Sequence, residues 1–210
     1  MPGKYDAVIF DMDGTLVDTL AMTVGAIAKY APQCGLPPLP REVIIPVIGY
    51  GNHEFYRALY PDAAPDVQRW VEDLVEAGEL EIGRTLGPKI LFPGAAEMLR
   101  RLREAGLPLF VASTGTSFHV EGCLEIGGVL TLFDRIACGE PDKIDMTAKL
   151  LRGFDPARVP FIGDSLKDVE AAHGNGLLAI GAGFGYAREG GAPFDVIYDT
   201  PQALCTALLG

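Results

Sequence analysis

The most constraining feature of the chain is the stretch AVIFDMDGTLVDT, which begins at Ala7. A short apolar run that is typical of a buried strand ends at Phe10, and two carboxylates, Asp11 and Asp13, follow with one residue between them. On an extended segment, side chains two residues apart point the same way, so both carboxylates face one spot at the carboxyl end of the strand. Their repulsion is costly unless a cation lies between them or one carboxyl keeps its proton. The stretch therefore predicts a cation site or an acid–base pair.

The rest of the chain separates into a helical block and an alternating block. Residues 16–86 carry helical apolar spacing interrupted by Pro and Gly, whereas strand and helix patterns alternate from residue 87 onward. Such alternation is typical of a doubly wound parallel α/β sheet with helices on both faces. We therefore predict a discontinuous α/β core domain of residues 1–15 and 87–210, with a small α-helical cap domain, residues 16–86, inserted after the first strand. Further strands are expected at 108–113, 135–138, 159–164, 177–183 and 195–199, and helices at 94–105, 117–126, 143–152, 167–174 and 201–209.

Composition and charge exclude several classes of partner. The formal net charge is −11, and only 17 Lys and Arg residues are spread over 210 positions, which argues against a nucleic-acid partner. No stretch approaches the roughly 18 apolar residues of a membrane span. The four cysteines lack paired spacing, as expected in a reducing compartment, and no apolar leader precedes the first carboxylates. We expect a cytoplasmic protein without a membrane partner; the oligomeric state is not predicted.

Polar residues recur where the predicted strands end. Ser113 and Thr114 follow one strand, Asp164 ends another and is followed by Asp168, and Lys143 lies between these segments. Each residue alone has a structural explanation as a helix cap, a turn residue or a surface side chain. Because sites in open parallel sheets form at the carboxyl ends of the strands, these groups should meet the first carboxylate pair. Together they indicate a site for a hard cation that faces an anion.

The motifs DMDGT, VAST, a downstream Lys and GDSLKD together resemble the four sequence motifs of the haloacid dehalogenase superfamily. The resemblance covers essentially the whole chain. The segments FPGAAEMLRRLREAGLPLFVAS, LAIGAGFGYARE and FDVIYDTPQAL resemble its phosphoglycolate phosphatase-like branch, in which a helical cap follows the first motif. The resemblance implies a Rossmann-like core and a phosphatase that hydrolyses a small phosphorylated metabolite, a phosphomonoester, through an aspartyl-phosphate.

The resemblance also implies a role for each residue. Asp11 is the expected nucleophile, and Asp13 is the expected general acid and then general base. Asp13 needs a raised pKa for this role, and the like charge of Asp11 supplies part of that shift. Asp13 also favours phosphoryl transfer over dehalogenation, which has no alkoxide to protonate. Lys143 would neutralise charge on Asp11 and the phosphate. The expected phosphate-binding residues are Ser113, Thr114 and Thr15.

Mg²⁺ is the implied cofactor, since oxygen ligands together with a substrate phosphate suit this ion. The expected ligands are the Asp11 side chain, the Asp13 carbonyl oxygen and Asp164. Asp168 is expected close by, either as a ligand or beside one.

The lysine of the third motif has two candidates. Many relatives carry Lys-Pro there, whereas this chain has Glu140 before Pro141 and its lysine later. Lys143 is the preferred candidate and Lys149 the weaker one.

Substrate choice is expected to depend on the cap loop from Gly49 to Glu54, in which Asn52 and His53 supply hydrogen bonds. The loop lacks a fixed cation, so small monoesters with hydroxyl or carboxylate groups are expected, with phosphoglycolate a candidate by resemblance. The other histidines, His119 and His173, share no ligand spacing with His53, which alone is expected near the site. Trp70 is expected in the core.

Two alternative functions remain open. A sugar-phosphate mutase of the same superfamily would carry an Arg in the cap loop, where this chain has Tyr50, Gly51, Asn52 and His53. A phospho-receiver signalling domain, from a different class, also uses an acidic cluster, a hydroxyl and a Lys. It needs neither a general acid such as Asp13 nor a cap of this length.

Overall fold

The computed structural model describes residues 4–210, except for the side chain of Asn52. One six-stranded sheet has the order β3-β2-β1-β4-β5-β6, and every neighbouring pair is parallel. The predicted doubly wound parallel sheet is therefore confirmed. The strands are β1 (Val8–Phe10), β2 (Leu109–Ser113), β3 (Arg135–Cys138), β4 (Phe161–Gly163), β5 (Ala179–Ala182) and β6 (Val196–Tyr198).

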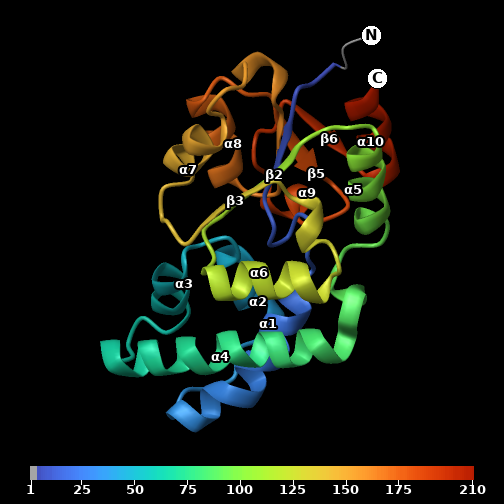
Figure 1. Ribbon diagram of the computed structural model, residues 1–210. Helices are drawn as coiled ribbons and strands as arrows, with labels where there is room; N and C mark the ends of the chain where they lie inside the picture. Colours follow the sequence, from blue (N-terminus) through green and yellow to red (C-terminus); the bar gives the residue numbers. More distant parts are fainter. Residues whose placement is uncertain (1–3) are drawn as a thin grey trace.

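Helices cover both faces of the sheet because successive strand residues point to opposite sides. Val8 and Phe10 of β1 pack into one fully buried cluster, whereas Ile9 packs into another on the opposite face. The helices α5 and α10 lie on the Phe10 side and α7 and α8 on the Ile9 side (Figure 1). Their bounds are α5 (Ala95–Glu104), α7 (Lys143–Leu150), α8 (Leu166–Gly174) and α10 (Pro201–Leu209).

A helical block lies between β1 and β2 in the chain and below the sheet in Figure 1. It has its own buried cluster, which includes Leu20, Ile27, Val71 and Val75. The boundaries of the predicted cap domain stay a prediction. The helices are α1 (Thr19–Tyr30), α2 (Arg41–Ile44), α3 (Asn52–Leu59) and α4 (Pro65–Leu86).

The helix α6 (Ser117–Ile126) follows β2 and lies along α4, so it joins the sheet to the helical block (Figure 1). The approach is close at Gly122, where an added Cβ would lie 2.8 Å from the side chain of Leu80. This packing brings residues of α4 and α6 together at one end of the sheet.

Two local features differ from the expectations. Trp70 is 50% exposed, so the prediction that it lies in the core is wrong; α4 buries the adjacent Val71 and Val75 and turns Trp70 to solvent. The short helix α9 (Ala187–Gly190) was not expected. Its Gly-rich surroundings carry no helical periodicity.

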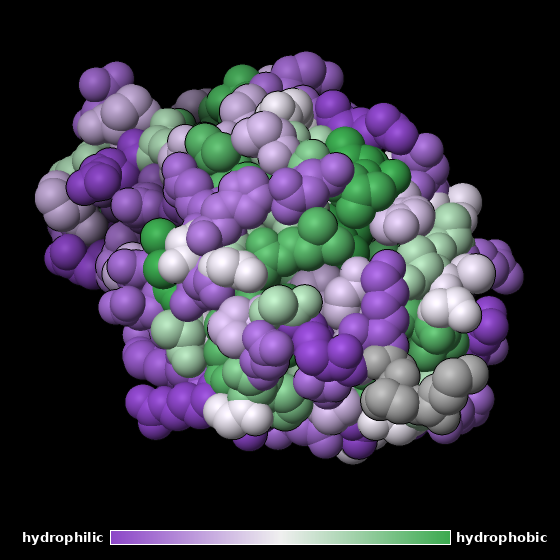
Figure 2. All heavy atoms as spheres, turned by 90° about the horizontal axis from the view of Figure 1, so that it is seen from above, coloured by the Kyte–Doolittle hydropathy of each residue, from purple (hydrophilic) through white to green (hydrophobic). Residues whose placement is uncertain are grey.

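The surface seen from above is mixed in character. Figure 2 shows hydrophilic residues around much of this face, with hydrophobic residues gathered in its middle. Within residues 4–210, no helix is both long enough and apolar enough to cross a membrane.

Candidate active site

The candidate site lies where the strand order reverses. β1 is flanked by β2 on one side and by β4 on the other. The chain first adds β2 and β3 on one side of β1 and then crosses to add β4, β5 and β6 on the other. Ligands bind at such a reversal in open α/β sheets, outside the carboxyl ends of the strands. The amide of Asp11 donates to the carbonyl of Ile162 at 2.8 Å, which fixes the end of β1 against β4. The loops after β1, β2 and β4 therefore converge here.

Lys143 lies at the centre of the buried carboxylates. Its Nζ donates to Oδ1 of Asp11 at 2.6 Å and to Oδ1 of Asp168 at 2.7 Å, and its side chain is 4% exposed. Burial works to lower the pKa of Lys143, but the two carboxylates outweigh it and raise the pKa above its ordinary value. Lys149 instead bonds Glu140 at the surface. The structure thus places Lys143 in the site and Lys149 outside it.

Asp11, Asp164 and Asp168 form a buried group whose carboxylate oxygens lie within 4.8 Å of one another. Burial raises the pKa of Asp11 to about 7, although Lys143 acts in the opposite direction. Burial and the neighbouring Asp11 charge also raise the pKa of Asp164 well above its usual range. Three buried carboxylates face one ammonium group, so negative charge is in excess. An all-oxygen donor set of this kind fits Mg²⁺.

Asp168 is more completely satisfied by the protein than the other two carboxylates. Oδ1 of Asp168 accepts from Lys143. Oδ2 of Asp168 accepts from the amide of Asp164 at 3.0 Å and from the amide and hydroxyl of Ser165 at 2.9 and 2.8 Å. These contacts hold the loop after β4 in place. Asp168 therefore supports both Lys143 and the backbone of Asp164.

Gly14 allows the loop after β1 to approach Asp164. Its φ is +78°, and an added Cβ would lie 2.4 Å from Oδ2 of Asp164 and 2.5 Å from the ring of Tyr186. Only Gly has both the conformational freedom and the space that this position needs. The next residue, Thr15, is buried, with its Oγ1 3.5 Å from Oδ1 of Asp164. Thr15 therefore contacts the same carboxylate.

The end of β2 supplies two buried hydroxyl groups. The Oγ of Ser113 lies 3.5 Å from Oδ2 of Asp13 and accepts from the amide of Gly115 at 3.2 Å. The Oγ1 of Thr114 donates to the carbonyl of Gly49 at 3.2 Å, so its hydroxyl contacts the loop between α2 and α3. These positions bring Ser113 to the carboxylate pair and tie Thr114 to the helical block.

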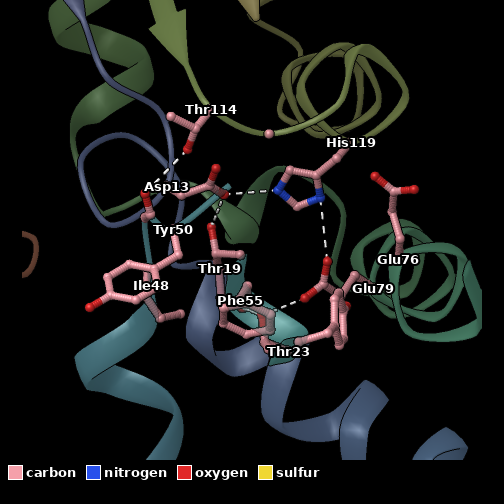
Figure 3. Close-up of a pocket in the computed structure, with 13 residues that line it drawn as sticks. Asp13, Thr19, Thr23, Ile48, Tyr50, Phe55, Glu76, Glu79, Thr114 and His119 are labelled. Atoms are coloured by element: carbon pink, nitrogen blue, oxygen red, sulfur yellow. Dashed lines mark hydrogen bonds and ion pairs between the residues drawn. The ribbon is translucent and has the colours of Figure 1, made fainter. Parts of the chain in front are cut away.

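Asp13 has surroundings that the sequence did not indicate (Figure 3). Its Oδ1 accepts from Thr19 Oγ1 at 2.5 Å and lies 2.9 Å from Nε2 of His119. Burial works to raise the pKa of Asp13, but the charge and hydrogen bond of His119 outweigh it and lower the pKa. This direction is opposite to the expected one, because His119 contributes more than the repulsion from Asp11.

His119 is the residue that the sequence reasoning missed. It is 6% exposed, and the Asp13 charge raises its pKa well above the usual range although burial works to lower it. His119 lies on the buried face of α6 beside Val120 and Cys123. A His in such a pattern is more often a core residue, so the pattern itself carries no signal for the site.

Two hollows open beside these residues. The Asp13 cavity, of about 50 Å³, is bounded by α1, α4, α6 and the segment Ile48–Tyr50 (Figure 3). The Asp164 cleft, of about 810 Å³, lies on the other side of the same segment and includes Arg57, Lys167 and Tyr186. Of the cap loop expected to face the site, Gly49 to Glu54, the residues Gly49 and Tyr50 border both hollows and Glu54 borders the cleft. Ile48, which precedes that loop, also borders both.

Of the two residues expected to bind substrate, only the side chain of His53 is described by the structure. His53 lies in the first turn of α3, which begins at Asn52, rather than in a loop. Its side chain is 81% exposed, and its Nδ1 lies 2.8 Å from Oε2 of Glu72 of α4. It borders neither hollow. The expectation for His53 is therefore corrected: the helix turns its ring toward α4 and solvent. The side chain of Asn52 lies outside the part of the chain that the structure describes.

Comparison with known proteins shows which family this chain resembles. The pattern of the haloacid dehalogenase-like hydrolases matches residues 5–176. A phosphoglycolate phosphatase of Synechococcus elongatus is 30% identical, over 96% of each chain. An N-acetylmuramic acid 6-phosphate phosphatase of Pseudomonas aeruginosa is 27% identical, over 98% of this chain and 95% of that one.

A solved structure shows the same fold. It is a predicted phosphoglycolate phosphatase from Haemophilus somnus 129pt, which superimposes with a TM-score of 0.83 at 21% identity and covers 97% of this chain and 98% of its own. At this level of identity the likeness concerns the fold alone. The family match and the relatives over nearly the full length carry the assignment: the chain belongs to the haloacid dehalogenase-like hydrolases, in their phosphoglycolate phosphatase-like branch, and is an enzyme of the phosphatase type.

Proposed function

We propose that the protein is a Mg²⁺-dependent phosphatase that hydrolyses a small phosphomonoester through an aspartyl-phosphate on Asp11. The observation that carries the proposal is the buried cluster in which Lys143 bonds Asp11 and Asp168 beside Asp164. With its three carboxylates ionised and Lys143 charged, the cluster carries two net negative charges, which one divalent cation would neutralise before an anionic phosphate enters. Membership of the family removes the phospho-receiver alternative.

The ion would be held by the Asp11 side chain, the Asp13 carbonyl oxygen and Asp164. Asp168 would act through its neighbours, because both of its oxygens already accept hydrogen bonds from the protein. When bound, Mg²⁺ supplies positive charge to the phosphate oxygens. Its charge would also offset the repulsion between the buried carboxylates of Asp11 and Asp164.

Asp11 is poised to attack phosphorus as a nucleophile. Lys143 occupies its Oδ1 at 2.6 Å and orients the carboxylate, which leaves Oδ2 for the bond to phosphorus. Ser113, and the amide of Thr114, would bind phosphate oxygens on the β2 side. Thr15 would act through Asp164, which its hydroxyl contacts.

Asp13 would transfer the protons of the reaction. Its Oδ1 is anchored by Thr19 and His119, whereas its Oδ2 faces the Ser113 side at 3.5 Å. In the first step Asp13 would have to carry a proton, which His119 disfavours in the free protein and which the negative charge of a bound phosphate would favour. It would give this proton to the leaving alkoxide, and in the second step it would take one from the water that attacks the aspartyl-phosphate. The same carboxyl therefore serves both halves of the cycle.

The substrate is proposed only as a class. The curated relatives act on molecules as different as phosphoglycolate and N-acetylmuramic acid 6-phosphate, so the identity of the alcohol varies within this similarity. The Asp164 cleft contains Arg57 and Lys167, and Lys167 pairs with Glu54 at 3.1 Å. The cleft also carries Glu54, Asp164, Glu170 and Glu189, so its charges do not select the alcohol, and phosphoglycolate is a candidate by similarity to the relatives alone. A cytoplasmic location and the lack of a nucleic-acid partner stay predictions from the sequence.

The test is a phosphate-release screen over small phosphomonoesters, with Mg²⁺ and with excess chelator. We expect catalytic release on at least one substrate with Mg²⁺, none in chelator, and none from Asp11→Asn. Undiminished turnover in chelator would contradict the metal assignment. Transfer of phosphate within a sugar, without release, would instead indicate the mutase alternative, which the absence of Arg from Tyr50–His53 disfavours.

A further inference from the structure

His119 bridges two carboxylates from different parts of the molecule (Figure 3). Its Nε2 lies 2.9 Å from Oδ1 of Asp13, and its Nδ1 lies 3.4 Å from Oε2 of Glu79. All three side chains are at most 14% exposed. With a carboxylate at each ring nitrogen, both nitrogens are placed to donate. His119 is thereby held at both ends.

Glu79 is itself fixed by a further contact. Thr23 of α1 donates through Oγ1 to Oε1 of Glu79 at 2.5 Å, and Thr23 also bonds the carbonyl of Thr19. A chain of contacts therefore runs from Thr23 through Glu79 and His119 to Asp13. It joins α1 and α4 of the helical block to α6 beside the sheet.

Stability alone does not call for a buried chain of charged groups of this kind. Removing charged groups from water costs several kcal/mol per ion in real proteins, and the mutual attraction of the groups offsets that cost only when the geometry is good. Apolar residues of similar volume would fill the same space without this cost. The chain instead ends on Asp13 beside the cavity, with each buried group held by a partner on another helix.

We propose that His119 is a positioning residue for proton transfer by Asp13, and this inference rests on the proposed phosphatase function. His119 and Thr19 together fix Oδ1 of Asp13. The carboxyl group can then no longer turn about its bond, and Oδ2 stays directed to the side of Ser113, where the leaving oxygen would emerge. Glu79 sets the tilt of the ring from the other end.

The role predicts that the effect of a substitution depends on the leaving group. An alkyl phosphate expels a strongly basic alkoxide that must be protonated, whereas p-nitrophenyl phosphate expels a weak base that needs little help. We expect His119→Ala to lower kcat/KM on an alkyl phosphate by about 10- to 100-fold and on p-nitrophenyl phosphate by less than about threefold. A purely structural role would lower both alike.

Two variants make the test specific. His119→Gln can place an amide N–H near the position of Nε2, so it should restore much of the activity on the alkyl phosphate. His173→Ala removes an exposed His that pairs with Asp195 away from the site, and it should change neither activity.

In the background of Asp13→Asn, loss of His119 should have no additional effect on the alkyl phosphate, because the group that His119 positions is already gone.

The outcomes separate this inference from the proposed function. Equal losses on both substrates in His119→Ala, or no loss on either, would overturn the positioning role while the phosphatase stands. A wild-type protein that releases phosphate from neither substrate would overturn the proposed function and the inference together. A loss on the alkyl phosphate in His119→Gln as large as that in His119→Ala, with unchanged thermal unfolding of His119→Gln, would also overturn the positioning role, because a donor N–H near the position of Nε2 would then not be sufficient.

Discussion

Asp11 and Asp13 are one residue apart in the chain, yet their electrostatic surroundings differ. Asp11 lies beside Lys143 in a group of carboxylates, where burial raises its pKa to about 7. Asp13 lies beside His119, which outweighs the effect of burial and lowers its pKa. Neighbouring titratable groups in distinct environments are typical of sites in which each has its own chemical role. The opposite pKa shifts of the two carboxyl groups arise from partners on β2, α6 and α7 rather than from the motif itself.

The first prediction at this scale separates the two lysines. Lys143→Ala should lower kcat by about 100-fold or more, because a charge-assisted contact to the nucleophile and the phosphate is lost in a buried site. Lys149→Ala, which removes a surface pair with Glu140, should leave kcat within about twofold of the wild type. Steady-state kinetics on any substrate of the screen measures both. A large loss in Lys149→Ala alone would move the third motif along the chain.

The structure brings together charged residues that the sequence predicted to meet, whereas their roles stay predictions and the contacts of His119 were not predicted. Asp11, Asp164 and Lys143 lie where strands or short loops end, so one-dimensional order was enough to bring them together. His119 lies at the site because α6 packs against α4. His53 lies away from it because α3 begins at Asn52 and directs the ring of His53 toward α4 and solvent. Both depend on tertiary packing that local patterns do not encode.

At the scale of elements, the strands were easier to predict than the segments that join them. Each strand is a short apolar run bounded by turn residues, and all six were found where these runs occur. The segment 187–190 gives α9 without helical periodicity, and Trp70 lies on the solvent side of α4. Helix orientation is set by the partner that a helix meets, which the sequence of one helix does not contain.

The loop after β1 carries a prediction that compares two glycines. Gly14→Ala introduces a Cβ 2.4 Å from Asp164 at a φ of +78°. Gly35→Ala introduces one at a φ of +73° with nothing within 4 Å, so it carries the backbone cost without the clash. We expect Gly35→Ala to cost about 1–2 kcal/mol and Gly14→Ala to cost more, with additional loss of Mg²⁺ binding.

Thermal unfolding with and without Mg²⁺ measures this difference. Gly35→Ala should keep the increase in Tm that Mg²⁺ gives the wild type, whereas Gly14→Ala should lose it. If both variants responded to Mg²⁺ like the wild type, the close approach of Gly14 to Asp164 would have no part in metal binding.

At the scale of the whole molecule, contacts between the sheet and the helical block border the site. Thr114 bonds the carbonyl of Gly49, Lys167 pairs with Glu54, and His119 contacts Glu79. These contacts surround the site on several sides. Burial of the charged groups strengthens the electrostatic interactions between them.

The buried carboxylates also predict how the metal affects global stability. Without a cation, Asp11, Asp164 and Asp168 repel one another, so Asp164→Asn should stabilise the metal-free protein by about 1 kcal/mol, which corresponds to a Tm increase of about 2–4 °C. Mg²⁺ at about 100 times its Kd should stabilise the wild type by about 2.7 kcal/mol, and the variant much less. Calorimetry in chelator and in Mg²⁺ tests both. A lower Tm for Asp164→Asn in chelator would contradict the account of the charges.

The central claim is that the phosphoryl group passes through Asp11, and a trapping experiment tests it most directly. The variant Asp13→Asn is incubated with Mg²⁺ and acetyl phosphate, whose leaving group needs no protonation, and is then quenched in acid. Because hydrolysis of the intermediate lacks its base, we predict a phosphoryl group on the peptide that contains Asp11, detected by mass spectrometry and released by hydroxylamine. The double variant Asp11→Asn/Asp13→Asn should carry none. Turnover of acetyl phosphate by Asp13→Asn with no phosphoryl group on Asp11, or a stable one on another residue, would contradict the account.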